Sequence, residues 1–419
     1  MIETHKSAER AFIVGVKLQE NSMEEIDDSL KELASLVDTA GAVVVESFVQ
    51  SRHNIDSAFY IGIGKVHELK GYAENENIDT IIFDTELSPS QIKNLEKEIG
   101  KKILDRSWVI LDIFANRAKT KEAKTQVELA QLKYFMPRLT RQWTHLSRQV
   151  GGGVGTKGPG ETQLETDKRL IRGRIQKLED ELKDIEKQRE FRRRSRKDEF
   201  KVSLVGYTNA GKSTLMNRLS NAGVLAEDRL FATLDSTTRV IELENKKKFL
   251  LSDTVGFIKK LPHNLVASFR STLEEVNDAD LLLHVIDISH KNFQEQMNTV
   301  EKVLRDLGAE SRKTLYVFNK SDNVDQEELE IRTEGKYKKN GIFISAQTGF
   351  NVDNLLTKIL EIMENDYQIE VFELNLKQSK IVSVIHSSTE VLEEEYLEDK
   401  VVIKAKAKKS SIDYIKSLF

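Results

Sequence analysis

The segment GYTNAGKST at 206–214 has the G-x-x-x-x-G-K-[S/T] spacing of a phosphate-binding loop, or P-loop. An apolar strand, KVSLVG, precedes it and a helical segment, TLMNRLS, follows. Gly206 and Gly211 allow backbone N–H groups to converge on phosphate oxygens, and the helix N-terminus favours negative charge. We expect Lys212 to reach the β- and γ-phosphates and the Ser213 hydroxyl to ligate Mg²⁺. Taken alone, the segment also fits an ordinary glycine-rich turn.

The segment LLSDTVGF at 250–257 is an apolar strand that ends in a D-x-x-G motif. In nucleotide sites of this type, an aspartate after a buried strand lies beside the metal ion. We therefore expect Asp253 to hold Mg²⁺ through a water molecule and the N–H of Gly256 to bind the γ-phosphate.

The segment FATLD at 231–235 lies between the P-loop and the D-x-x-G motif, where a switch loop belongs. Switch loops become ordered when they contact the γ-phosphate and its Mg²⁺. We expect Thr233 to be the Mg²⁺ ligand from this loop in the GTP state. Thr237 and Thr238 are weaker candidates for the same role.

Two motifs point to guanine: NKSD at 319–322, after the strand TLYVF, and SAQ at 345–347, after GIFI. Asp322 can accept hydrogen bonds from the guanine ring N–H and exocyclic amine, which adenine does not supply. A buried acceptor that adenine leaves unpaired gives strong discrimination. Asn319 and Lys320 should brace the loop and stack along the base, while SAQ supplies a backbone N–H for the guanine oxygen.

Along the chain, the five motifs follow one another as P-loop, FATLD, D-x-x-G, NKSD and SAQ, and together they predict a site that binds and hydrolyses GTP. Mg²⁺ should be held by Ser213 and Thr233 directly and by Asp253 through water. The predicted nucleotide contacts are Gly206, Tyr207, Thr208, Asn209, Ala210, Gly211, Lys212, Ser213, Thr214, Phe231, Ala232, Thr233, Leu234, Asp235, Asp253, Thr254, Val255, Gly256, Asn319, Lys320, Ser321, Asp322, Ser345, Ala346 and Gln347.

Two positions bear on how GTP would be hydrolysed, and neither identifies a certain catalytic residue. Signalling GTPases carry Gln after D-x-x-G to orient the attacking water, whereas this chain has Phe257. We expect slow intrinsic hydrolysis that a partner stimulates. Asn209 has two possible roles. It is either a K⁺ ligand beside the phosphates, as in several GTPases with an Asn at this P-loop position, or a residue that stabilises the turn.

Composition excludes several functional classes. The 419 residues carry a net charge of −4 and no cysteine, so disulfides, cysteine zinc sites and thiol nucleophiles are excluded. The eight histidines show no H-x-x-x-H pattern, so we expect no metal beyond Mg²⁺ and K⁺. The sequence shows no run of about 18 apolar residues, and residues 1–16 lack the apolar stretch that a signal peptide has. We expect a monomeric cytoplasmic protein without stable membrane insertion; peripheral membrane association is left open.

The succession of helix-like and strand-like patterns along the chain predicts an α/β protein with four parts. An N-terminal parallel-sheet α/β subdomain (1–118) is followed by a helical hairpin (119–197), the GTPase domain (198–366) and a small α+β domain (367–419). In the N-terminal part, helix-like stretches alternate with runs rich in β-branched residues. These runs are AFIVGVKL (11–18), AVVVESFV (42–49) and TIIFDT (80–85).

The predicted hairpin consists of two helices around a glycine-rich loop at 151–162. Pro137 should kink or end the first helical stretch, at 120–145. Apolar residues of the second helix are spaced seven, four, three, four and three apart, which is a heptad seam. This seam should pack lengthwise on the first helix as an antiparallel pair. Its members are Leu164, Ile171, Ile175, Leu178, Leu182 and Ile185.

Together with the GTPase motifs, three upstream segments give the chain a specific resemblance to the HflX family. They are YIGIGKVHEL (60–69), DIFANRAKTKEAKTQVELAQLKYFMPRL (112–139) and GGGVGTKGPGETQLETDKR (151–169). The resemblance covers most of residues 1–366. It implies a ribosome-associated GTPase that binds the large ribosomal subunit and splits stalled or hibernating ribosomes. It also implies that the glycine-rich loop reaches the peptidyl-transferase centre.

The tip of the hairpin is polar, small and flanked by basic residues, as an RNA-approaching element requires. The candidate rRNA contacts are Gly151, Gly152, Gly153, Lys157, Arg148, Lys168 and Arg169. The alternative for this segment is a flexible interhelical loop. Two other functions remain open: a large-subunit assembly or sensing factor that splits nothing, and a signalling switch, which the basic hairpin disfavours.

Overall fold

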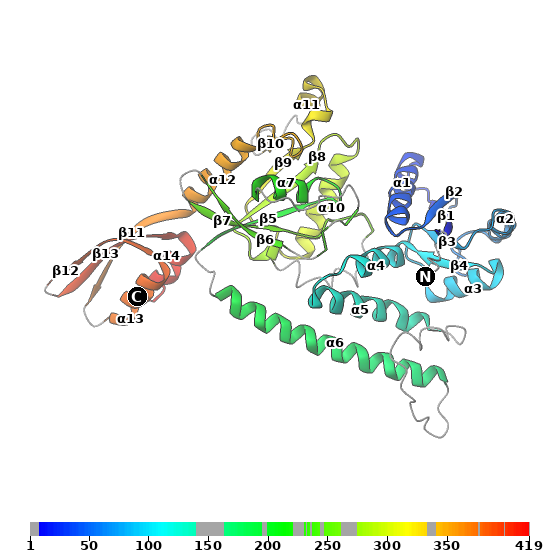
Figure 1. Ribbon diagram of the computed structural model, residues 1–419, viewed down its shortest axis with the longest axis horizontal. Helices are drawn as coiled ribbons and strands as arrows, with labels where there is room; N and C mark the ends of the chain where they lie inside the picture. The colour runs from blue at the N-terminus through cyan, green and yellow to red at the C-terminus, as the bar shows by residue number, and fades with distance from the viewer. Residues whose placement is uncertain are drawn as a thin grey trace, which may run out of the picture.

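The computed structural model describes residues 8–139, 163–194, 199–220, 230–231, 233–234, 237–243, 247–260, 275–332, 341–375, 378–397 and 399–418. It has three sheets, and a helical hairpin lies between the first and the second along the chain (Figure 1). The α/β fold class that the sequence predicts is confirmed. No helix within the described ranges is both long and apolar enough to cross a membrane.

The N-terminal sheet is parallel throughout, in the order β2-β1-β3-β4. Its strands are β1 (Arg10–Lys17), β2 (Val43–Ser51), β3 (Thr80–Phe83) and β4 (Lys102–Asp105). Three helices connect them: α1 (Met23–Thr39), α2 (Ile63–Asn75) and α3 (Pro89–Ile99). Capping boxes at Ser22 and Ser88 satisfy backbone N–H groups at the starts of α1 and α3. Helix α1 lies on the side of the sheet that faces the central domain (Figure 1).

Helices α4 (Arg106–Arg117), α5 (Lys121–Phe135) and α6 (Gln163–Arg194) follow this sheet. Helix α5 gives way to a short 3-10 turn that contains Pro137, as predicted. The predicted packing of α6 on α5 is confirmed: Ile171 and Leu178 of α6 lie in one apolar cluster with Leu129 and Leu132 of α5. In Figure 1, α6 lies lengthwise beside α5 and extends well beyond it.

The central domain has a six-stranded sheet in the order β10-β9-β8-β5-β7-β6, in which β6 is antiparallel to β7 and the other pairs are parallel. Its strands are β5 (Phe200–Gly206), β6 (Thr237–Glu242), β7 (Lys248–Asp253), β8 (Leu281–Asp287), β9 (Thr314–Asn319) and β10 (Gly341–Phe343). Its helices are α7 (Lys212–Ser220), α10 (Phe293–Asp306), η3 (Ser321–Asn323), α11 (Gln326–Arg332) and α12 (Val352–Asp366). The carboxyl ends of β5, β7, β9 and β10 lead into the predicted nucleotide-binding motifs, and α/β sheets bind ligands at this edge.

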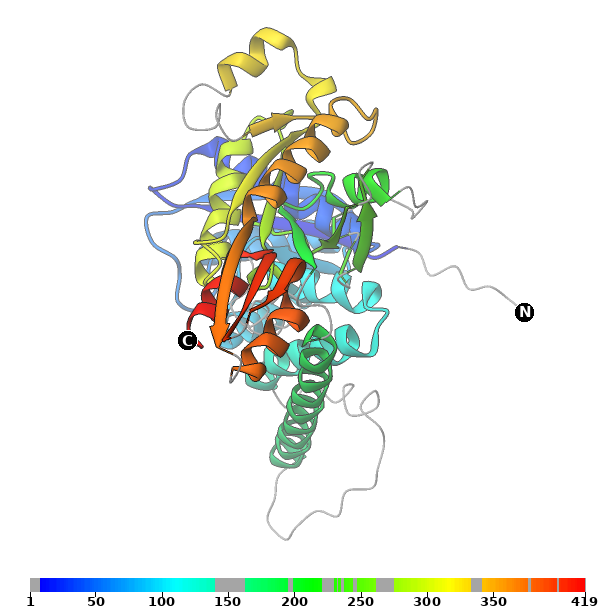
Figure 2. The ribbon, with the colours of Figure 1, turned by 90° about the vertical axis from the view of Figure 1, so that its left-hand side faces the viewer.

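The C-terminal sheet is antiparallel, in the order β11-β13-β12. It comprises β11 (Tyr367–Asn375), β12 (Glu390–Tyr396) and β13 (Lys400–Lys408), with α13 (Ser379–Ser388) and α14 (Lys409–Lys416). Figure 2 shows this sheet in orange and red. Lys408 connects it to the central domain, because its Nζ donates 2.8 Å to Asp280 and 2.9 Å to the carbonyl of Glu199.

Candidate nucleotide-binding site

The P-loop turns sharply between β5 and α7, and two of its glycines are required by close contacts. A Cβ atom at Gly206 would lie 2.2 Å from the carbonyl oxygen of Val285, and one at Gly211 would lie 2.1 Å from the side chain of Asn319. Gly211 also has a φ of +91°, which favours glycine. The loop can therefore follow this path only with glycine at both positions.

Lys212 is the first residue of α7, and its side chain is buried. Its Nζ donates to the carbonyl oxygens of Gly206, at 3.0 Å, and Tyr207, at 2.7 Å. Burial lowers the pKa of Lys212 to about 8, and the charge of Asp253 opposes this shift. A buried ammonium group whose hydrogen-bond partners are neutral carbonyls favours an anion beside it.

Three oxygen atoms predicted to surround Mg²⁺ lie together. The Ser213 Oγ is 2.8 Å from Thr233 Oγ1, and both hydroxyls donate to Asp253 Oδ2 at 2.9 Å. The other oxygen, Asp253 Oδ1, is buried and has no hydrogen-bond partner among the described residues. Burial raises the pKa of Asp253, whereas Lys212 and the two hydroxyls lower it. A hard cation would satisfy this buried carboxylate, so the residues fit Mg²⁺.

The donor set also agrees with the way Mg²⁺ binds in nucleotide sites. Within the described part of the chain, no group of three or more His, Cys, Asp or Glu side chains could hold a metal ion. Mg²⁺ usually retains several waters and takes one or two protein oxygens together with substrate phosphates. Two hydroxyls and one carboxylate are therefore a sufficient set of protein oxygens for Mg²⁺.

Asn319 connects three of the predicted motifs. Its Nδ2 donates 2.8 Å to the carbonyl of Ala210 in the P-loop, and its Oδ1 accepts from the N–H of Ala346 at 2.8 Å. Lys320 has a left-handed φ of 61°, and its Nζ lies 2.7 Å from Asp287. Asp322 is exposed on η3, so its carboxylate is open to a base. The P-loop, NKSD and SAQ thus meet at one site.

Two residues near this site carry no recognisable sequence signal. Arg218 of α7 donates from Nε to the carbonyl of Ala346 at 3.2 Å and from Nη2 to the carbonyl of Gln347. Asp287, at the end of β8, accepts the ion pair from Lys320. Both hold the guanine-side loops from outside the motifs, and a one-dimensional pattern does not identify them.

The D-x-x-G segment pairs with the P-loop through its backbone. The N–H of Phe257 donates 3.1 Å to the carbonyl of Gly206, and the carbonyl of Phe257 accepts from Thr208 at 2.7 Å. A Cβ atom at Gly256 would lie 2.9 Å from Thr208 and 3.1 Å from Lys212 Nζ. The Phe257 side chain is only 2% exposed and belongs to an apolar cluster. It therefore cannot orient a water molecule.

The remaining predicted contacts have mixed surroundings. Asn209 is exposed, with a left-handed φ of 60°. The ring of Phe231 lies 4.7 Å from that of Phe114 of α4 and faces away from solvent. Thr254 donates to the carbonyl of Leu204 at 2.6 Å. Buried or half-buried positions are also occupied by Thr214, Leu234, Val255, Ser321 and Ser345. Ala232 and Asp235 lie outside the described residues.

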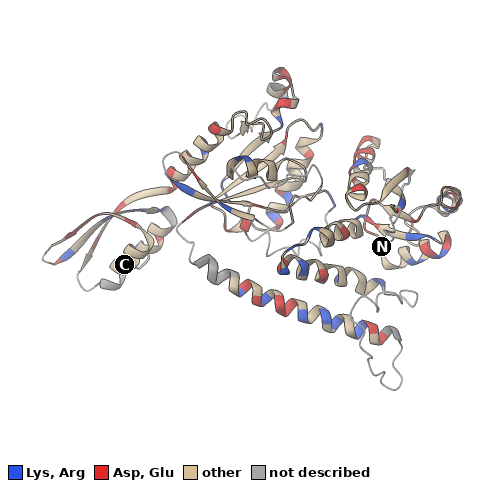
Figure 3. Cartoon of the chain, viewed as in Figure 1, with Lys and Arg blue, Asp and Glu red and all other residues tan. Residues whose placement is uncertain are grey.

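Most of the candidate RNA contacts lie outside the described residues: Arg148, Gly151, Gly152, Gly153 and Lys157. Lys168 and Arg169 lie near the start of α6, where Lys168 is half-buried and Arg169 is exposed. Figure 3 shows acidic and basic residues interspersed along α6. The described part of α6 is therefore not uniformly basic.

Three family descriptions match consecutive parts of the chain. Residues 27–115 match "GTP-binding GTPase N-terminal", residues 117–196 match "GTP-binding GTPase Middle Region" and residues 201–320 match "50S ribosome-binding GTPase". The order of the three matches follows the order of the N-terminal sheet, the hairpin and the central sheet.

Similar proteins cover nearly the whole chain. GTPase HflX of Caldanaerobacter subterraneus subsp. tengcongensis is 45% identical over 97% of this chain and 92% of its own length. GTPase HflX of Escherichia coli K12 is 40% identical, over 99% and 96%. A solved GTP-binding protein from Sulfolobus solfataricus, in complex with GDP, is 27% identical over 85% of this chain and 99% of its own, with a TM-score of 0.45. On the sequence matches, this chain belongs to the HflX family of GTPases.

Proposed function

We propose that this GTPase associates with the large (50S) ribosomal subunit and splits stalled or hibernating ribosomes into subunits, using GTP binding to drive the step and hydrolysis to release the factor. It would act as a monomer in the cytoplasm, on ribosomes and their rRNA. The proposed working units are residues 1–118, 119–197, 198–366 and 367–419. The match of 201–320 to a 50S ribosome-binding GTPase family supports the ribosome as partner.

The proposed nucleotide chemistry rests on one observation: the side chains of Ser213, Thr233 and Asp253 are within hydrogen-bonding distance of one another beside the P-loop. Mg²⁺ bound here would screen the charge of the phosphates. Ser213 and Thr233 would ligate it directly, and Asp253 would hold it through water. Lys212, with its lowered pKa, would be fully charged once phosphate oxygens lie beside it.

Guanine recognition would come from two loops that Asn319 holds together. Asp322 would accept the ring N–H and exocyclic amine of the base, and the SAQ loop would donate a backbone N–H to its carbonyl oxygen. Arg218 would keep the SAQ loop in place through the carbonyls of Ala346 and Gln347. GTP and GDP would both satisfy these contacts.

Hydrolysis would be slow in the free protein, because the buried ring of Phe257 replaces a water-orienting Gln. The ribosome would stimulate turnover by ordering the switch segments or by supplying a polar group. K⁺ held by the exposed Asn209 would add a fixed positive charge beside the phosphates. Its left-handed backbone is also compatible with a purely structural role in the turn.

The hairpin would be the part that reaches rRNA. The α5–α6 pair is held by an apolar seam and by the ion pairs of Arg174 with Glu128 and Lys133 with Glu179. A stiff pair of helices can carry the loop at 151–162 into a narrow cavity. Lys168 and Arg169 would contact phosphates near the base of that loop.

GTP turnover with and without purified 50S subunits tests this proposal. We expect turnover to rise at least about tenfold with 50S subunits, as partner-completed GTPase sites do. Turnover stimulated by 50S subunits without release of subunits from intact ribosomes would favour an assembly or sensing factor instead. Unchanged turnover would reject the ribosome as the activating partner. Lys212→Ala, which removes the phosphate-binding ammonium, is the inactive control.

A further inference from the structure

The P-loop and the segment after D-x-x-G both contact the N-terminal domain through polar side chains. The Tyr207 hydroxyl donates 2.5 Å to Glu32 Oε1 of α1 and accepts from the N–H of Lys259 at 2.8 Å. Lys260 Nζ donates 2.5 Å to Asp84 Oδ2 and 2.9 Å to the Asp84 carbonyl, at the end of β3. Both contacts join residues far apart in the sequence.

Arg106, at the start of α4, joins the two carboxylates. Its Nη1 donates 2.8 Å to Asp84 Oδ1, and its Nη2 pairs with Glu32. Burial acts to lower the pKa of Arg106, but Glu32 and Asp84 outweigh it and raise the pKa. We call Glu32, Asp84, Arg106, Tyr207 and Lys260 the interdomain latch. It contains two cations and two carboxylates, so its charges balance.

The two cations of the latch differ in how easily they can leave it. The side chain of Arg106 is 1% exposed and that of Asp84 is 4% exposed, whereas Lys260 is 45% exposed. Lys260 also has a left-handed φ of 56°, which a non-glycine residue keeps only when its surroundings hold it. It follows Gly256, the expected γ-phosphate contact, by four positions. The latch therefore holds a segment that the nucleotide must also position.

A second, apolar contact ties the other switch segment to the same N-terminal half. The ring of Phe231 packs edge-on against Phe114 of α4, at 4.7 Å and 87°. Two positions further on, the Thr233 hydroxyl lies beside Ser213 and Asp253, where we expect it in the GTP state. The latch is thus closed in the same conformation in which Thr233 occupies its expected GTP-state position.

We propose that the interdomain latch makes the N-terminal domain a sensor of the nucleotide, and that the closed latch favours GTP over GDP. A contact that exists mainly in one conformation shifts the equilibrium toward that conformation and toward the ligand that prefers it. Asp84 and Glu32 would be positioning residues, acting on the nucleotide through Lys260 and Tyr207. This role of the latch concerns nucleotide binding alone and does not depend on ribosome splitting.

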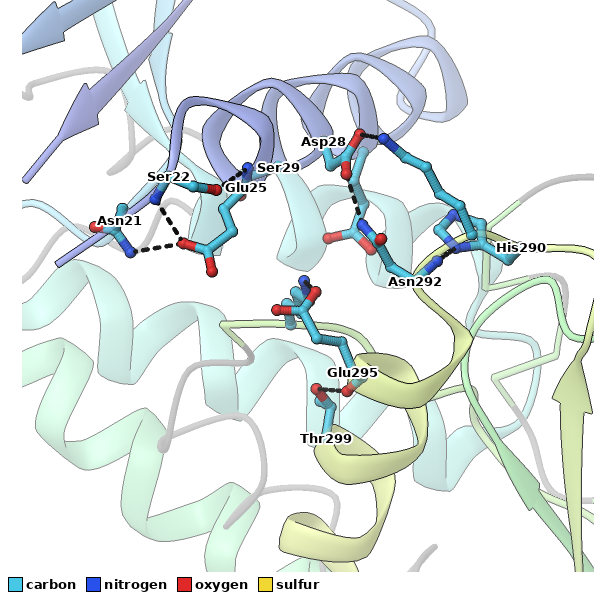
Figure 4. A network of polar contacts seen from close by, with 12 residues as sticks. Asn21, Ser22, Glu25, Asp28, Ser29, His290, Asn292, Glu295 and Thr299 are labelled. Atoms are coloured by element: carbon cyan, nitrogen blue, oxygen red, sulfur yellow. Dashed lines mark hydrogen bonds and ion pairs between the residues drawn. The ribbon is translucent and has the colours of Figure 1, made fainter. Parts of the chain in front are cut away.

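The outer edge of the same interface offers a matched control. Asp28 of α1 pairs with Lys291 at 2.8 Å and accepts from Asn292 Nδ2 at 2.6 Å (Figure 4). These contacts also join α1 to the central domain, yet none of the three residues is a predicted nucleotide contact. Asp28→Asn therefore weakens the interface without touching the latch.

The test measures the Kd of GDP and of a non-hydrolysable GTP analogue, with Mg²⁺ and the full chain, for Asp84→Asn, Lys260→Met and the double variant. We expect each single variant to lower the preference for the GTP analogue over GDP by about fivefold or more, a typical size for coupling between sites. The double variant should lower it no further than one single variant, because both remove the same contact. Lys260→Arg and Asp28→Asn should keep the preference.

Two results would overturn the proposal. One is an unchanged nucleotide preference in both single variants, even if their unfolding temperature falls, since the network would then only hold the domains together. The other is a double variant whose effect equals the product of the two single effects. If Asp84→Asn does not fold, Lys260→Met and Lys260→Arg decide the question, because that side chain lies at the surface. These assays contain no ribosomes, so a result that overturns the latch proposal would not contradict the proposed function.

Discussion

The hydroxyl of Thr233 lies 2.8 Å from that of Ser213, and the two share Asp253 Oδ2 as acceptor. The sequence offered Thr233, Thr237 and Thr238 as ligands from the switch region. Thr238 instead pairs with Ser252 at 2.9 Å, on the β6–β7 ladder. This geometry favours Thr233 as the Mg²⁺ ligand.

Thr233→Ala should weaken binding of a GTP analogue in Mg²⁺ by at least about tenfold, because it removes a hydroxyl from a charged site. GDP binding should be unchanged, since the switch loop contributes to the metal site only in the GTP state. Thr238→Ala is the control and should affect neither nucleotide. Equal losses of GDP and GTP affinity in Thr233→Ala would contradict this assignment.

Asp322→Asn should lower GTP affinity by about a thousandfold or more, as expected when a site built to pair polar groups loses its match. The amide should instead donate to the extra carbonyl of xanthine, so xanthosine triphosphate should bind better than GTP. Competition binding with GTP and xanthosine triphosphate measures this change in nucleotide preference. Glu327→Gln, at an exposed position of α11, removes the same charge nearby and should keep guanine preference. A GTP preference retained by Asp322→Asn would rule out Asp322 as the base contact.

The nucleotide-free protein should become more stable as the pH rises from about 8 toward 10.5. Burial lowers the pKa of Lys212 from 10.5 to about 8, so within this range the unfolded chain binds the proton and the folded chain does not. Stability rises with pH wherever the unfolded state binds more protons, here by up to about 3 kcal/mol. Urea unfolding of the wild type and Lys212→Met at pH 7.5 and 10 measures the effect. If the free energy of unfolding changes equally with pH in the two proteins, Lys212 is not the cause of the pH dependence.

Phe257→Gln should not raise intrinsic GTP turnover. The backbone pairing of residue 257 with Gly206 and Thr208 directs its side chain into an apolar cluster, away from the phosphates. Burying the amide there should lower the free energy of unfolding by about 1–3 kcal/mol, while Phe257→Leu should cost less. Single-turnover hydrolysis and urea unfolding provide the readouts. Fast intrinsic hydrolysis by the unmodified chain would show that no partner is required.

GTP turnover should be faster in K⁺ than in Na⁺ buffer if the exposed Asn209 holds K⁺ beside the phosphates. Asn209→Ala should then remove the difference between the two salts. Equal turnover of the wild type in K⁺ and Na⁺ would leave Asn209 as a residue that stabilises the turn, which its left-handed backbone also fits.

Local spacing in the sequence predicts much of this architecture, whereas the rest depends on contacts between distant positions that the sequence does not reveal. The P-loop, D-x-x-G and NKSD motifs and the heptad seam of α6 are patterns within short windows, so sequence alone identifies them. Strand β4 has only four residues, KILD, which is too short a pattern to predict a strand from the sequence. Arg218 and the partners of Tyr207 are equally invisible, because their contacts join positions that only folding brings together.

Sedimentation of intact ribosomes incubated with the protein and a non-hydrolysable GTP analogue is the direct test of ribosome splitting. We predict a shift from whole ribosomes to free subunits with the wild type and none with Lys212→Ala. Because GTP binding is proposed to drive subunit separation, GTP hydrolysis should not be needed. Ribosomes that stay intact with both the analogue and GTP, while 50S subunits still stimulate turnover, would contradict ribosome splitting.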